Sequence, residues 1–164
     1  MLCFSSTRII CLAMLAGIVL HLPAGADGES GRFNRFALST GCTPLTLRVI
    51  LNDELEALGI SRRAVNDLVT GYLHSAQLYS TRSKALIIVT LQVVGEAFLM
   101  RVAFAKIVVD PDTKAAGPAT TWRVEHLGLH AGDTGALLDG LDGAVGNFMK
   151  AYLNVNREAC QQQP

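Results

Sequence analysis

Two histidines four positions apart, His126 and His130, are the closest approach to a metal-binding pair in this 164-residue sequence. On a helix this spacing would place both side chains on one face, where they could bind one zinc ion. Here the neighbouring Val124, Leu127 and Leu129 indicate a strand, on which four residues span about 13 Å. That separation is too long for one ion, so we expect no metal site and two solvent-facing histidines near a strand end.

Nucleophilic catalysis has no motif in the sequence either. His74 and Ser75 are neighbours, but adjacent residues of a helix point about 100° apart and cannot form a nucleophile–base pair. The chain contains no Gly-x-Ser-x-Gly elbow. We therefore expect no catalytic residue and no cofactor.

A small acidic group follows the first predicted strand and consists of Asp53, Glu54 and Glu56, with Arg62 and Arg63 close behind. Open α/β sheets often bind ligands beyond the carboxyl ends of their strands, so this group could form a small polar binding edge. We favour an ordinary solvated loop before a capped helix, because such turn chemistry is common on protein surfaces.

The first 26 residues have the form of an export signal peptide. Arg8 supplies a positive start, residues 9–22 are an apolar run, and Ala24-Gly25-Ala26 offers the small residues of a signal-peptidase site. We expect the mature chain to begin at Asp27, in the periplasm or outside the cell, with no stable membrane insertion after cleavage. A retained anchor is the disfavoured alternative, because the run is shorter than the roughly 20 apolar residues that span a bilayer.

The remaining 138 residues fit one domain and are numerous enough to bury a core. They carry 13 basic and 14 acidic side chains and no cluster of Lys and Arg. This balance gives no electrostatic basis for binding nucleic acid or an anionic membrane surface.

Only two cysteines, Cys42 and Cys160, remain once the signal is removed. An even pair in an exported chain favours a disulfide bond, which here would close nearly the whole domain. The chain-entropy model gives a loop of this length about 4–5 kcal/mol, as an upper figure. Two unpaired thiols without a role are the alternative.

The periodicity of apolar residues defines the elements between residues 44 and 160. Residues 27–43 show no sustained period and are expected to form a mobile lead-in, and residues 161–164 a tail. Alternation and three- to four-residue spacing first predict a strand over 44–52 and a helix over 61–76 capped by Ser61. Two strands follow, over 85–94 and 97–109, joined by a Gly95-Glu96 hairpin. The last elements are a strand over 120–130 and a helix capped by Asp133 or Thr134.

The predicted order is therefore β-α-β-β-β-α. Each strand has one clearly more apolar face, and two helices that cover one face of a four-stranded mixed sheet satisfy this pattern. The fold class is α+β, a two-layer sandwich in which the first helix connects parallel strands and the hairpins are antiparallel.

The polar face of this sheet is the surface most available to a partner, and it carries Arg48, Thr90, Gln92 and Arg101. It could equally be plain solvent-facing sheet. Trp122, the only tryptophan, could be an exposed aromatic contact. More often such a residue covers the edge of a core.

In its signal, its single strand–helix pair, its long hairpins, its Thr-Trp pair at 121–122 and its closing helix ending at 148–156, the sequence resembles small exported bacterial α+β proteins of unassigned function. The resemblance implies a periplasmic or secreted location and supplies no catalytic residues.

Three hypotheses about function follow from these features. The leading one is a non-enzymatic exported domain that binds a protein or envelope component through its open sheet face. The second is a small exported hydrolase that uses His126 or His130 with Asp53 or Glu54. The third is a structural subunit that self-associates through the outer strand of the hairpin over 85–109.

Overall fold

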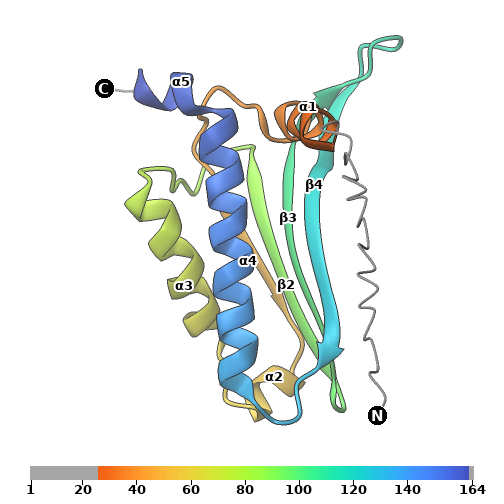
Figure 1. The fold of residues 1–164 in the computed structure, drawn as a ribbon, viewed down its shortest axis with the longest axis vertical. Coiled ribbons are helices and arrows are strands. Elements are labelled where there is room, and N and C mark those ends of the chain that lie inside the picture. The colour runs from red at the N-terminus through yellow and green to blue at the C-terminus, as the bar shows by residue number, and fades with distance from the viewer. Residues whose placement is uncertain (1–25, 163–164) are drawn as a thin grey trace, which may run out of the picture.

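The structure is a computed structural model that describes residues 26–162 and shows one mixed β-sheet with helices packed on one side of it (Figure 1). The elements in chain order are α1 (Ala26–Leu38), β1 (Thr46–Leu51), α2 (Glu54–Ala57), α3 (Arg62–Ser75), β2 (Leu86–Val94), β3 (Ala97–Val109), β4 (Ala116–Leu129), α4 (Thr134–Val155) and α5 (Arg157–Gln161). The predicted α+β class and the order of its four strands and two main helices are confirmed.

The four strands lie in the sheet in their sequence order, β1-β2-β3-β4. β1 and β2 are parallel and are connected through α2 and α3, whereas β2–β3 and β3–β4 are antiparallel. Gly95 has a positive φ of 59°, which suits the first central residue of a two-residue hairpin. The hairpin therefore closes where the sequence places it.

Helices α3 and α4 lie side by side along one face of the sheet (Figure 1). Strand residues at alternate positions point into this layer, and the bulkiest side chains that they bury include Ile87, Leu91 and Phe104. Phe104 contacts the rings of Phe148 and Tyr152 from α4, with centroids 5.9 and 5.7 Å away. These aromatic contacts lie in the core between the sheet and the helices.

Both main helices begin at the residues that the sequence indicates. The Ser61 hydroxyl accepts a hydrogen bond from the Ala64 amide at 3.1 Å, and the Asp133 carboxylate accepts one from Ala136 at 3.0 Å. Each cap satisfies an amide that the first helical turn leaves without a partner.

Three short helices were not expected. α1 occupies most of the region interpreted as a lead-in, and its last turn buries Ala37 and Leu38 in the core. Lys106 holds this turn by donating to the Phe36 and Ser39 carbonyls at 2.7 and 2.9 Å. These contacts come from a distant strand, so local periodicity could not reveal them. α2 and α5 are single short turns of helix.

Residues 1–25 of the predicted signal peptide, which include its apolar run, lie outside the described residues, as do the last two residues of the tail. The last residue of the predicted signal, Ala26, is the first residue of α1. Within residues 26–162, no helix is both long and apolar enough to cross a bilayer.

The hypothesis of self-association through the hairpin is wrong in its choice of strand. β3 pairs with β2 on one side and with β4 on the other, so it has no free edge. The two edge strands of the sheet are β1 and β4.

Candidate functional site

Within residues 26–162, no helix covers one of the two faces of the sheet, which is called the open face below (Figure 1). Strand register assigns to it the residues at alternate positions that do not point toward the helices: Arg48, Ile50, Ile88, Thr90, Gln92, Val94, Ala97, Leu99, Arg101, Ala103, Arg123, Glu125, Leu127 and Leu129. Four of the five binding residues expected from the sequence are therefore on one surface.

The centre of the open face is polar. Arg101 and Glu125 are directly opposite each other on β3 and β4, with Nε and Oε1 2.7 Å apart, and Arg123 reaches the same carboxylate at 3.6 Å. Arg101 Nε is buried without a well-aligned hydrogen bond to any described residue, so the contact with Glu125 is an ion pair only. Thr90 continues the same row on β2 and is buried beneath its neighbours.

The hairpin end of the open face is apolar and is called the apolar end. Leu127 lies opposite Leu99, and Leu129 lies opposite Ala97, which in turn pairs with Val94. Leu127, Leu129 and Val94 are 81%, 72% and 73% exposed. Opposite residues in antiparallel strands bring their Cβ atoms within about 5 Å, so these side chains form one patch. Adjacent exposed apolar residues of this kind are typical of interaction surfaces.

Trp122 does not belong to the open face. It pairs with Phe104 and packs against Phe148 with ring centroids 5.3 Å apart, so it points toward the helices. The interpretation of Trp122 as a binding residue is not supported by this position, and its alternative role at the edge of the core is the one observed. A β-bulge next to Trp122 interrupts the alternation of side chains along β4. The sequence alone therefore does not show which face of the sheet Trp122 occupies.

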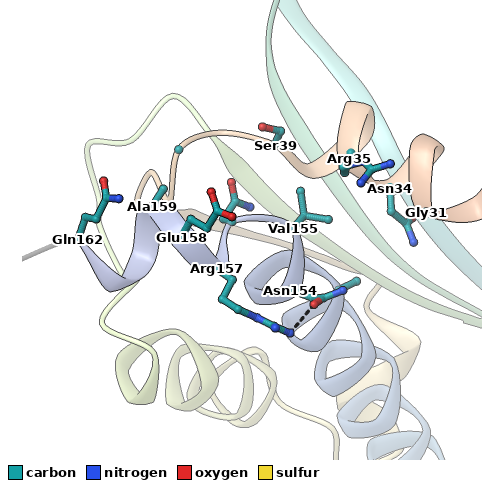
Figure 2. Close-up of a pocket in the computed structure, with 13 residues that line it drawn as sticks. Gly31, Asn34, Arg35, Ser39, Asn154, Val155, Arg157, Glu158, Ala159 and Gln162 are labelled. Carbon is teal, nitrogen blue, oxygen red and sulfur yellow. Dashed lines mark hydrogen bonds between the residues drawn. The ribbon is translucent and has the colours of Figure 1, made fainter.

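A pocket of about 720 Å³ lies between α1 and the junction of α4 with α5 (Figure 2). Its charged side chains are Arg35 from α1 and Arg157 and Glu158 from α5. Arg157 donates to Asn154 of α4 at 2.7 Å and is directed toward that helix rather than toward Arg35 (Figure 2). The basic groups therefore do not converge on a common ligand position.

The wall of that pocket is a structural junction, called the clamp, in which Asn156 holds residues 38–42 against α4. Its side-chain amide donates to the Leu38 and Tyr152 carbonyls and accepts from Thr40 and Cys42. Asn156 is buried, so each of these bonds replaces water that the folded chain excludes. Nothing in the sequence pattern around Asn156 distinguished it, because its partners Leu38, Thr40 and Cys42 are more than 100 residues away.

The predicted disulfide completes the clamp. Cys42 and Cys160 are joined with an S–S distance of 2.00 Å and Cα atoms 5.1 Å apart. Next to it the Tyr152 hydroxyl donates to the Thr43 carbonyl at 2.7 Å, and burial raises the pKa of Tyr152 above its usual value. The bridge therefore ties α5 to the segment that enters β1.

His126 in β4 and His130 just after it have different surroundings. His130 is 8% exposed, its Nε2 contacts the Gly95 carbonyl at 2.9 Å, and its Nδ1 accepts from the Gly132 amide at 2.9 Å. The expectation that His130 faces solvent is wrong, because its ring joins the β2–β3 hairpin to the turn before α4. His126 is exposed, as expected.

The remaining candidates for chemistry are also not assembled. The ring of His74 contacts that of Tyr79 in a tilted arrangement, with centroids 4.6 Å apart, and Ser75 donates to the Gly71 carbonyl of its own helix. Arg62 donates to the Val49 carbonyl at 2.7 Å. Among the described residues, no three His, Cys, Asp or Glu side chains gather closely enough to hold a metal ion.

The geometry thus defines the class of the molecule as an α+β domain with one helix-covered and one uncovered sheet face. No protein-family model matches the chain, and no curated protein matches its sequence. Among solved structures, it is similar to a minor lipoprotein from Acinetobacter baumannii at 11% identity and a TM-score of 0.27, over 73% of this chain and 96% of that one. A provisionally assigned lipoprotein from Caulobacter crescentus is similar at 14% identity and a TM-score of 0.30, over 85% and 99% of the two chains. These values are too low to support an argument about function.

Proposed function

We propose that the protein is an exported, non-enzymatic binding domain whose open face takes up an apolar protein surface flanked by acidic groups. The observation that carries this proposal is the apolar end, where Val94, Leu127 and Leu129 are exposed beside one another. Burying such side chains against a partner would stabilise a complex, at about 25 cal/mol for each Å² of apolar surface removed from water.

The charges of the open face support the acidic character of the partner. Its strands carry Arg48, Arg101 and Arg123 but only one carboxylate, Glu125. Arg48 is exposed and forms no ion pair with any described residue. A partner that places carboxylates opposite Arg48 would therefore gain complementarity and orientation, which charged groups at an interface supply.

Export is part of the proposal and has two supports. The first is the signal-like composition of residues 1–26. The second is the Cys42–Cys160 disulfide, since such bonds persist in oxidising compartments such as the periplasm and the extracellular medium.

The test places a photo-crosslinking amino acid at position 127 and, in a matched control, at position 33, because Phe33 is an exposed aromatic residue of α1. Both proteins are exposed to an extract of the envelope of the source cells. We expect one product that forms from position 127 but not from position 33. We expect R48E to weaken the binding of this partner by about tenfold, or about 1.4 kcal/mol. Equal products from both positions, or none from position 127, would contradict the proposal.

A further inference from the structure

The outer edge of β4 is the longest unpaired edge in the described part of the sheet. β4 contains 14 residues, and within residues 26–162 it pairs with no strand other than β3. Its first half is protected by Pro118, by the bulge, and by Thr121, which donates to the Ala37 carbonyl of α1 at 2.6 Å. The stretch from Trp122 to Leu129 has none of these devices.

The opposite edge of the sheet, β1, is shorter than the β4 edge and partly covered. It is only six residues long, and Arg62 covers its Val49 carbonyl. Just before it, Leu45 forms a bridge with Tyr79. Short edges and charged covers discourage strand addition, whereas a long regular edge offers free amides and carbonyls to another strand.

We propose that a second copy of this chain pairs antiparallel with the β4 edge, about a two-fold axis at Val124. In this register Arg123 lies opposite Glu125 of the partner subunit, and symmetry repeats the pair. Glu125 is only about one-third exposed and Arg123 is two-thirds exposed, so both have surface left to contribute. Opposite charges directly across an antiparallel pair stabilise it.

Residues on the other face of β4 also match in this register. Val124 meets its own copy, and Trp122 lies opposite His126 of the partner subunit. A two-fold axis perpendicular to the sheet keeps both helix layers on the same side. The dimer would therefore hold one continuous eight-stranded sheet, with the two open faces joined.

Neighbouring registers are less favourable. An axis at Glu125 would place two carboxylates directly opposite each other, which is destabilising. An axis at His126 would place Glu125 opposite Leu127 of the partner subunit and would leave the charges without reciprocal partners. The charge pattern of residues 123–125 thus selects the axis at Val124.

The register is tested by cysteine cross-linking of the purified full-length expression product, with its N-terminus read by mass spectrometry. V124C places two thiols opposite each other at the axis, and we expect a reducible dimer on mild oxidation. H126C is the matched control, because the two copies of position 126 would be separated by four residues, or about 13 Å along the strand. Efficient cross-linking of H126C but not V124C would overturn the register.

The charge pairing is tested separately by light scattering over a concentration series. R123E would place like charges opposite each other twice, and we expect it to raise the dimer Kd at least tenfold. R48E is the control, because Arg48 shares the open face but lies on β1, and it should leave the Kd unchanged. A wild-type protein that stays monomeric at millimolar concentration would overturn the dimer. That result would leave the proposed binding by the open face intact, because partner capture at position 127 does not require a second copy.

Discussion

The two faces of the same sheet differ in what their apolar residues do. On the helix-covered face, Val89, Leu91 and Val102 are fully buried beneath α3 and α4. On the open face, Leu127 and Leu129 keep most of their surface exposed to solvent. Apolar burial is the main favourable term in folding, so the first set explains the fold and the second set does not.

This difference separates the residues that stabilise the fold from the residues that the proposed function would use. Residues that contribute little to folding and yet are large and apolar are candidates for an intermolecular role. Substitutions on the two faces should therefore affect different measurements.

The largest effect is expected from Phe148→Ala on the helix-covered face. Phe148 is fully buried and contacts Phe104, Trp122 and Tyr152, so its removal leaves a cavity among three rings. We expect the free energy of unfolding to fall by about 3–5 kcal/mol. Urea unfolding followed by circular dichroism measures this, and a loss below about 1 kcal/mol would show that the aromatic cluster is not the centre of the core.

The helix-covered face is also the part of the fold that the sequence predicts best. Alternation in the strands and the stripe at Val65, Val69 and Leu73 follow directly from the need to bury one face of each element. The same reasoning did not predict α1, because its large apolar residues Phe33 and Phe36 are exposed. Only Ala37 and Leu38 mark its buried turn. Its position depends on Lys106 and Thr121, contacts that no local pattern contains.

The next effect is expected from the double variant C42A/C160A. The bridge joins residues 118 positions apart, and its loss releases most of the chain in the unfolded state. We expect a loss of about 2–5 kcal/mol with far-ultraviolet circular dichroism retained, because the core remains large enough to hold the fold. A melting temperature unchanged from that of the oxidised wild type would contradict this.

A smaller effect is expected from Asn156→Ala, which removes the side chain at the centre of the clamp. The Leu38 carbonyl and the Thr40 amide would lose their partners in a buried position. We expect a loss of about 1–3 kcal/mol in denaturant unfolding. Asn147→Ala is the matched control, since Asn147 is exposed on α4 and should change stability by less than about 0.5 kcal/mol.

His126, near the end of β4, and His130, the residue that follows this strand, give a local comparison. His130→Ala removes two contacts with backbone groups, so we expect a loss of about 1–2 kcal/mol. His126→Ala removes an exposed ring and should change stability by less than about 0.5 kcal/mol. Equal effects of the two substitutions in the same unfolding assay would contradict the assignment of His130 as a structural link.

The candidate site could be predicted only in part. Alternation placed Arg48, Thr90, Gln92 and Arg101 on one face, because register in a sheet follows the burial of the other face. The apolar end was missed, although Leu127 and Leu129 share the alternation of Arg123 and Glu125 in the sequence. Apolar residues on a strand are ordinarily assigned to a core, and only the structure shows that no described element covers these two.

The smallest effect on stability is expected from the open face itself. The double variant L127S/L129S replaces two highly exposed leucines, and neither lies in the buried core cluster. Removing them costs the folded state little buried surface, so we expect the free energy of unfolding to change by less than about 0.5 kcal/mol. Cross-linking to the proposed partner from a nearby photo-crosslinker at position 94 should fall at least tenfold in the same variant. A loss of several kcal/mol in unfolding would instead show that the apolar end is covered within the molecule, and the contrast between the two faces would not hold.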